Sequence, residues 1–138
     1  MNEIIFSYTT KQAVVDGELI KIDSGILNEI GIKFPVYLTN TVYRRYVEVP
    51  ANAKGLQDID GRLFDLLYMF ASAAAHSEES YIKYAFTCIL QQNAVLLANE
   101  NKAVYSPLHT LVILKSVITA QDIDDPSPAI FIMLPSED

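Results

Sequence analysis

The spacing of apolar residues changes from a helical to a strand period in the middle of the chain. Between Ile59 and His76 the apolar residues follow the three- and four-residue spacing of one helix face. That face comprises Leu63, Leu66, Leu67, Phe70 and Ala74. After the polar SEES segment the period becomes two, which is typical of a strand with one buried face. This second face comprises Ile82, Tyr84, Phe86, Cys88 and Leu90.

Capping and turn residues divide the first third of the chain into short elements. Threonine, aspartate and serine accept hydrogen bonds from the first backbone N–H groups of a helix, and glycine is common just past its end. Proline holds the preceding residue in an extended conformation, so Phe34 is predicted to be extended. The predicted elements are a helix over Lys11–Asp16, a strand over Glu18–Ile22, a helix between Asp23 and Gly31, and a helix from Thr39 or Asn40 to Val47, ended by Pro50.

Two further runs rich in β-branched residues follow, at Leu111–Ile118 and at Ala129–Leu134, the second bounded by Pro128 and Pro135. Between the strand that contains Ile82 and the run Leu111–Ile118, residues 94–98 fit either another strand or a helical turn. Helices mostly precede strands, which favours an α+β fold over a parallel α/β sheet. We therefore expect an antiparallel sheet of about three to four strands, packed by helices from the N-terminal half.

Two aromatic residues, Phe64 and Tyr68, form a second row on the long helix, four positions apart. This row widens the apolar face beyond what one contact with a sheet requires. It fits either a binding surface for a partner or an extension of the core, and the sequence favours the core.

The composition limits the classes of function. The 138 residues are close to the commonest size of a single domain and too few for two independent cores, so we predict one domain over residues 1–138. The formal net charge of −7 opposes contact with phosphate backbones, since nucleic-acid binding requires clustered basic residues. Nonspecific binding to nucleic acid is therefore not expected.

A cytoplasmic location is predicted from cysteine use and from hydropathy. Cys88 is the single cysteine, so neither an intramolecular disulfide nor a cysteine-rich zinc site forms within one chain. The first residues lack the basic segment and the apolar stretch of a secretory signal. The apolar stretch Leu63–Ala75 is interrupted by Asp65 and Ser72 and is too short to cross a bilayer, so no contact with a membrane is expected.

Catalytic and metal-binding motifs are absent from the sequence: it contains no phosphate-binding glycine loop, no dinucleotide fingerprint, no zinc-protease pair and no nucleophile elbow. A catalytic Cys88 would need a nearby histidine and access to solvent, and a buried thiol is the simpler interpretation. Asp122, Asp124 and Asp125 offer oxygen ligands for Ca²⁺ or Mg²⁺, but a turn between two strands explains them better. No catalytic residue, metal or cofactor is therefore predicted.

The arginines form the one charged cluster that suggests a ligand. Arg44, Arg45 and Arg62 are the three arginines of the chain and come from neighbouring segments. Guanidinium groups bind carboxylate or phosphate through a planar fork, so these side chains could line a pocket for an anion. The alternative is an ordinary pair between Arg62 and Asp65, three positions apart on the helix surface, and this interpretation is favoured.

Several segments together resemble an uncharacterised domain family carried by bacterial plasmids, conjugative elements and phages. These segments are YTTKQAVVDGELI, FPVYLT, DGRLFDLLYMF, LVILKSV and the closing IFIMLPSED. The matching positions are Tyr8, Thr9, Gln12, Asp16, Gly17, Pro35, Val36, Leu38, Thr39, Gly61, Arg62, Leu63, Phe64, Asp65, Leu134, Pro135, Glu137 and Asp138. The chain departs from the family pattern by carrying Phe64 and Tyr68 where tryptophan is common, and by an insertion around NENKAVYSP. The resemblance implies an accessory gene product of a mobile element, with a role in countering host defence or regulating transfer.

Three functions remain open from the sequence. The first is a noncatalytic accessory protein that binds a host or element-encoded protein, and a homo-oligomer is compatible with it. The second is a binder of a small anionic ligand such as a nucleotide. The third is an enzyme whose residues converge only in three dimensions. The candidate binding residues are Arg62, Asp65, Arg44, Arg45, Tyr8, Thr10 and Asp16.

Overall fold

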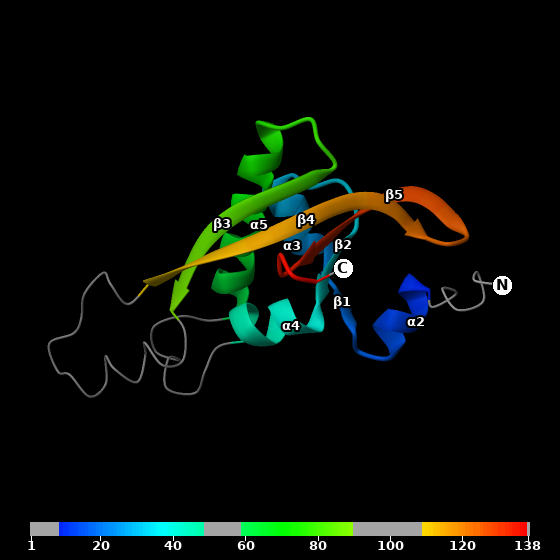
Figure 1. The fold of residues 1–138 in the computed structure, drawn as a ribbon, viewed down its shortest axis with the longest axis horizontal. Coiled ribbons are helices and arrows are strands. Elements are labelled where there is room, and N and C mark those ends of the chain that lie inside the picture. Colours follow the sequence, from blue (N-terminus) through cyan, green and yellow to red (C-terminus); the bar gives the residue numbers. More distant parts are fainter. Residues whose placement is uncertain (1–8, 49–58, 90–108, 138) are drawn as a thin grey trace, which may run out of the picture.

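The computed structural model describes residues 9–48, 59–89 and 109–137, and its fold is α+β (Figure 1). A five-stranded sheet has the strand order β1-β2-β5-β4-β3. The strands are β1 (Leu19–Lys21), β2 (Val36–Thr39), β3 (Tyr81–Ile89), β4 (His109–Asp122) and β5 (Asp125–Met133). The helices are α2 (Thr10–Val15), α3 (Ser24–Ile30), α4 (Asn40–Val42), the π-helix η1 (Tyr43–Val47) and α5 (Ile59–Ala75).

The sheet is mixed, so the expectation of three to four antiparallel strands is wrong in two respects. β2 was not predicted, and it pairs parallel to β5 with Val36 opposite Ile130. The other three strand pairs are antiparallel. Val36, Tyr37 and Leu38 are all buried, so β2 has no alternation of polar and apolar residues by which a strand is recognised.

The capping residues form the predicted helix ends. The Thr9 hydroxyl accepts a 2.9 Å hydrogen bond from the Gln12 N–H at the start of α2, and the Asp23 carboxylate accepts one from Gly25 at the start of α3. Gly31 ends α3 with φ +99°, a conformation that glycine adopts without strain. The helix–strand–helix order predicted for the first third is confirmed.

The helix predicted to reach Val47 changes its winding on the way. The Thr39 hydroxyl accepts a hydrogen bond from Val42 N–H and begins α4. The chain then widens into η1, where the Glu48 N–H donates to the carbonyl oxygen of Tyr43 at 3.0 Å, five positions back. Pro50, expected to end this helix, lies outside the described residues.

Helix α5 packs its predicted apolar stripe against the sheet and the neighbouring helices. Leu66, Leu67 and Phe70 are buried, and the Phe70 ring meets the Tyr84 ring of β3 edge to face at 5.8 Å. Phe64 and Tyr68 instead stack on each other at 5.9 Å and are exposed to solvent, so their assignment to the core is wrong. Each follows a stripe residue by one position, about 100° around the helix, which turns it away from the sheet.

Strands β4 and β5 extend beyond the predicted runs and form a long hairpin. Asp122 pairs with Asp125 across a two-residue turn of Ile123 and Asp124, so the interpretation of the acidic segment as a turn is confirmed. The side chain of Cys88 and residues 94–98 lie outside the described part of the chain. No helix in the described ranges is long and apolar enough to cross a membrane.

Candidate functional site

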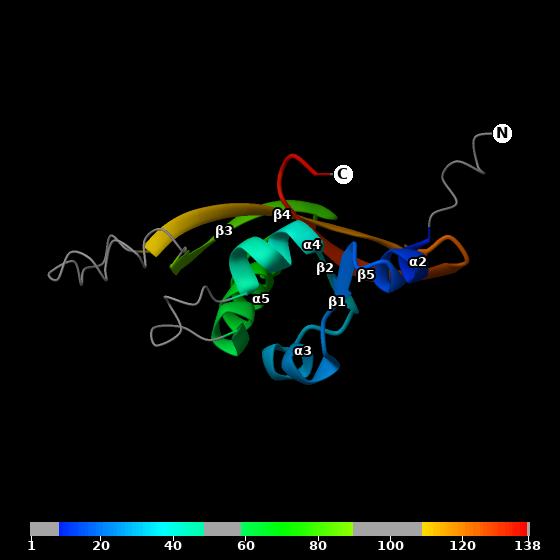
Figure 2. The ribbon, with the colours of Figure 1, turned by 90° about the horizontal axis from the view of Figure 1, so that it is seen from below.

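In the described part of the chain, helices cover one face of the sheet, and the other face is exposed to solvent mainly over β3 and the first half of β4. Figure 2 shows α3, α4 and α5 on the same side of the sheet, while α2 lies at the end near the β4–β5 turn. Side chains of adjacent strands align across the opposite side: Tyr37 of β2, Phe131 of β5, Val117 of β4 and Tyr81 of β3 are consecutive partners in the ladders. The part over β3 and β4, which we call the open face, comprises Tyr81, Lys83, Ala85, Leu111, Ile113, Lys115 and Val117.

Large apolar side chains on the open face are exposed to water. Leu111 is 64% exposed and Ile113 is 45% exposed, and Tyr81, on the other side of the pair Lys83–Lys115, is about half exposed. An antiparallel sheet that faces solvent on one side normally carries polar residues there. Large exposed apolar side chains grouped on such a sheet indicate an interaction surface.

A hollow of about 610 Å³ adjoins the open face toward the β4–β5 turn. Lys115 and Val117 belong both to the open face and to the wall of this hollow, and Thr10 of α2 closes one side. The remaining wall is formed by Thr119, Ala120, Asp122, Ile123, Phe131 and Met133. A mainly apolar hollow beside an apolar surface suits an anchoring side chain of a bound partner.

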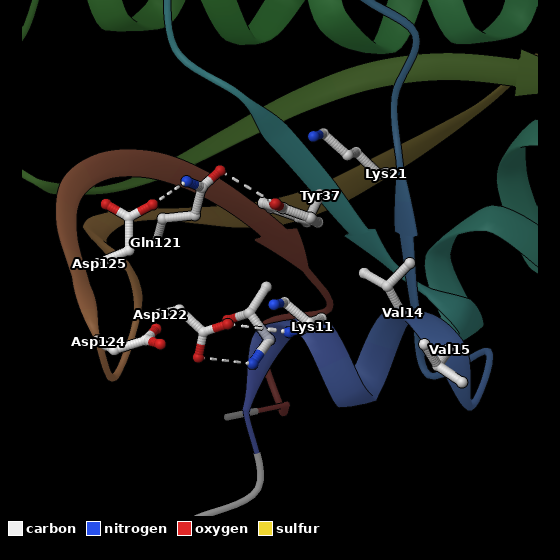
Figure 3. Close-up of a pocket in the computed structure, with 10 residues that line it drawn as sticks. Lys11, Val14, Val15, Lys21, Tyr37, Gln121, Asp122, Asp124 and Asp125 are labelled. Atoms are coloured by element: carbon white, nitrogen blue, oxygen red, sulfur yellow. Dashed lines mark hydrogen bonds between the residues drawn. The ribbon is translucent and has the colours of Figure 1, made fainter.

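A second hollow, of about 530 Å³, lies between α2 and the β4–β5 turn (Figure 3). In it the Tyr37 hydroxyl donates a 3.0 Å hydrogen bond to Gln121 Oε1, and Gln121 Nε2 donates to the Asp125 carboxylate at 2.7 Å. Burial raises the pKa of the Tyr37 phenol, and the negative charges of Asp122 and Asp125 add to the effect. The tyrosine therefore remains a neutral hydrogen-bond donor.

Asp122 fastens the start of α2 to the β4–β5 hairpin. Its carboxylate accepts hydrogen bonds from the backbone N–H groups of Thr10 at 3.1 Å, Lys11 at 3.0 Å and Ile123 at 2.8 Å. Partial desolvation raises the pKa of Asp122, but these three donors and the charge of Lys11 outweigh it and hold the pKa below its ordinary value. The first N–H groups of α2 are thus already occupied by the protein's own carboxylate.

The lowered pKa of Asp122 predicts a specific loss of stability in acid. A carboxylate whose pKa is lower in the folded than in the unfolded chain stabilises the fold above its unfolded pKa, and that stabilisation disappears as pH falls through the folded pKa. The Asp122→Asn variant should therefore melt below the wild type at pH 7, and the difference should shrink below about pH 4. Thermal melts at a series of pH values measure this, and a constant difference at all pH values would contradict it.

The predicted site residues do not form one pocket. Arg62 is only 1% exposed, so the expectation that it pairs with Asp65 at the helix surface is wrong. Its Nη1 donates a 2.7 Å hydrogen bond to the carbonyl oxygen of Glu48, just past the end of η1. Asp65, Arg44 and Arg45 are exposed. Asp16 caps the end of α2, Thr10 borders both hollows, and Tyr8 lies outside the described residues.

Several residues that carry the family resemblance hold the fold together. The Thr39 hydroxyl at the end of β2 donates a 2.8 Å hydrogen bond to the Glu137 carboxylate, which also accepts one from the Leu134 N–H. The carbonyl oxygen of Gly17, a residue with φ +83°, accepts a hydrogen bond from the Asn40 side chain. These contacts join β1, β2 and the segment after β5. They give the motif residues Gly17, Thr39, Leu134 and Glu137 a structural role in the fold.

Sequence reasoning missed the open face, although the sequence contains a signal for it. In the run LVILKSV, Val112 and Leu114 point into the core, and Leu111 and Ile113 occupy the alternate positions. A strand with one solvated face should carry polar residues at those alternate positions. Apolar residues at both sets of positions indicate that the second face is also covered by something.

The comparisons with known proteins identify a family and no activity. The model of a family described as "Family of unknown function (DUF6573)" matches residues 1–138. No curated protein and no solved structure matches the chain. Among the described residues, no group of three or more histidine, cysteine, aspartate or glutamate side chains is arranged to hold a metal ion. Since the family model spans the whole sequence, the chain belongs to the family of unknown function DUF6573.

Proposed function

We propose that this protein acts without catalysis, by binding another protein through the open face of β3 and β4. The observation that carries the proposal is the exposure of Leu111 and Ile113 on a sheet face that the helices α3, α4 and α5 leave uncovered. Burial of such side chains contributes about 25 cal/mol for each Å² of apolar surface removed from water. A partner that covers this face would therefore gain binding free energy from it.

Within this proposal the partner is a host or element-encoded protein of the cytoplasm, as expected for an accessory protein of a mobile element. Countering host defence is one such role. Binding of this kind requires a surface and no catalytic group, which agrees with the lack of catalytic motifs in the sequence.

The charged residues that line the hollow between α2 and the β4–β5 turn give less support to the alternative of a small anionic ligand. The hollow in Figure 3 is lined by Lys11 and Lys21 but also by three aspartates, Asp122, Asp124 and Asp125. The carboxylates outnumber the ammonium groups and would repel an anion. The alternative of an enzyme relied on five polar residues, Tyr8, Thr10, Asp16, Arg62 and Asp65. Thr10 and Arg62 are on the helices α2 and α5, which lie apart in both views of the fold.

Site-specific photocrosslinking in cells that produce the protein tests the proposal. A photoreactive phenylalanine analogue at Ile113, on the open face, should give a crosslinked protein adduct on irradiation. The same analogue at Val15, an exposed apolar position on α2 outside the open face, is the matched control and should give little adduct. Equal adducts from both positions, or none from Ile113, would contradict the proposal.

A further inference from the structure

Two lysines lie directly opposite each other in the middle of the open face. Lys83 of β3 pairs with Lys115 of β4. The Ile118 N–H donates to the carbonyl oxygen of Ser80 at 2.8 Å, and hydrogen-bonded and non-hydrogen-bonded pairs alternate along an antiparallel ladder. Lys83 and Lys115 therefore form a non-hydrogen-bonded pair, the type in which opposite side chains come closest. Like charges in this position destabilise a sheet.

Lys115 is also nearly buried, with 8% of its surface exposed. Its ammonium group lies 5.8 Å from the centre of the Tyr81 ring, which offers a cation–π contact. No carboxylate among the described residues forms an ion pair with Lys115 or Lys83. The Lys115 ammonium nitrogen is not among the buried polar atoms that lack a hydrogen-bond partner, so it reaches solvent beside Lys83. Within the described part of the chain, the two ammonium groups face each other without a counter-charge.

The strand neighbours of the lysine pair are apolar, and the nearest acidic residue of the described chain in the adjoining hollow is Asp122, near the β4–β5 turn. Along the strands it is flanked by Tyr81 and Val117 on one side and by Ala85 and Ile113 on the other. Across the sheet, Lys115 pairs with Met133 of β5. A positive centre in an apolar surface, on a chain with a formal net charge of −7, is complementary to a negative group with apolar neighbours.

We propose that Lys83 and Lys115 bind a carboxylate from a peptide segment of another protein, in which aspartate or glutamate is flanked by apolar residues. The apolar neighbours of that carboxylate cover Ile113, Leu111 and Val117 and exclude water from the ion pair. The ammonium groups then gain the counter-charge that they lack in the free chain. This inference rests on the proposed function, because it assigns the chemistry of the partner that binds the open face.

Selection from a random display library of 12-residue peptides against the full chain tests the inference. The enriched peptides should carry an aspartate or glutamate between apolar residues. Synthetic peptides of the enriched sequences should bind Lys83→Glu about tenfold more weakly than wild type in fluorescence anisotropy titrations. The matched control is Lys33→Glu, which makes the same charge change on the loop between α3 and β2 and should bind as wild type does.

The outcomes separate the inference from the function on which it rests. The enriched peptides could lack acidic residues, fail to bind Ile113→Asp and still bind Lys83→Glu. That result would overturn the role of the lysines, while binding through the open face would stand. Peptides that bind equally to wild type, Ile113→Asp and Lys83→Glu would overturn both. Sedimentation equilibrium of the free protein tests the remaining alternative, that a second copy of the chain binds the open face. Self-association that Lys83→Glu abolishes would support this alternative and overturn the inference.

The Lys115→Met variant tests the uncompensated charge without any ligand. Methionine keeps most of the apolar volume of the lysine stem but removes the ammonium group and its repulsion of Lys83. The melting temperature should rise by about 3 °C. A melting temperature below that of the wild type would show that the charge is already compensated in the free chain, and would overturn the inference.

Discussion

Replacing Arg62 by alanine should lower the free energy of unfolding by about 3 kcal/mol. The side chain is 1% exposed, and its guanidinium donates the 2.7 Å hydrogen bond to the Glu48 carbonyl oxygen that joins α5 to the end of η1. The substitution removes a large buried side chain and leaves that carbonyl oxygen without this donor. Urea denaturation followed by circular dichroism measures the loss.

Two further variants separate this structural role from binding of an anion. Arg62→Lys keeps the charge but loses the planar fork, so it should restore part of the stability only. Arg45→Ala removes an exposed arginine from η1 and should change the free energy of unfolding by less than about 0.5 kcal/mol. An Arg62→Ala protein as stable as the wild type would contradict the structural role and return Arg62 to the list of candidate ligand-binding residues.

The Phe70→Ala variant should lose about 4 kcal/mol of stability, whereas Phe64→Ala on the same helix should lose less than about 1 kcal/mol. Phe70 is 3% exposed and contacts Tyr84 of β3, while Phe64 is 37% exposed and stacks on Tyr68. The two substitutions remove the same atoms from one helix, so they compare the buried and the solvent-exposed face of α5. Urea denaturation measures both.

Similar losses from Phe64→Ala and Phe70→Ala would show that the second aromatic row belongs to the core, as the sequence first indicated. Tyr68→Ala, alone and combined with Phe64→Ala, provides the control for the stacked pair. A double variant that loses no more stability than either single variant would assign both losses to the mutual contact.

The elements set by local chemistry were predictable from the sequence. The helix ends at Thr9, Asp23 and Gly31 follow from hydrogen bonds and backbone conformations within a few residues, and so does the two-residue turn after Asp122. Helix α5 was predictable because its stripe is long and regular. The α+β class followed from the order of these elements.

Features that depend on distant parts of the chain were not predictable. Residues 36–38 of β2 are buried throughout, because Val36 and Leu38 face the core and Tyr37 stacks on Phe131 of β5 on the other face. No pattern in VYLT indicates these neighbours. The spacing of Arg62 and Asp65, three positions apart on the helix, predicts a pair at the surface. The hydrogen bond from Arg62 to the Glu48 carbonyl oxygen depends instead on where η1 ends. The opposition of Lys83 and Lys115 depends on the register between β3 and β4, which the sequence does not specify.

The position of β5 in the sheet restricts the order in which the protein can fold during synthesis. β5 leaves the ribosome after the other four described strands, yet it pairs with both β2 and β4 and is the central strand of the described sheet. In a nascent chain that ends before Asp125, the described strands form two separate ribbons, β1 with β2 and β3 with β4, and two-stranded ribbons are marginally stable in water. Until β5 emerges, the apolar residues of both ribbons stay accessible to chaperones and proteases.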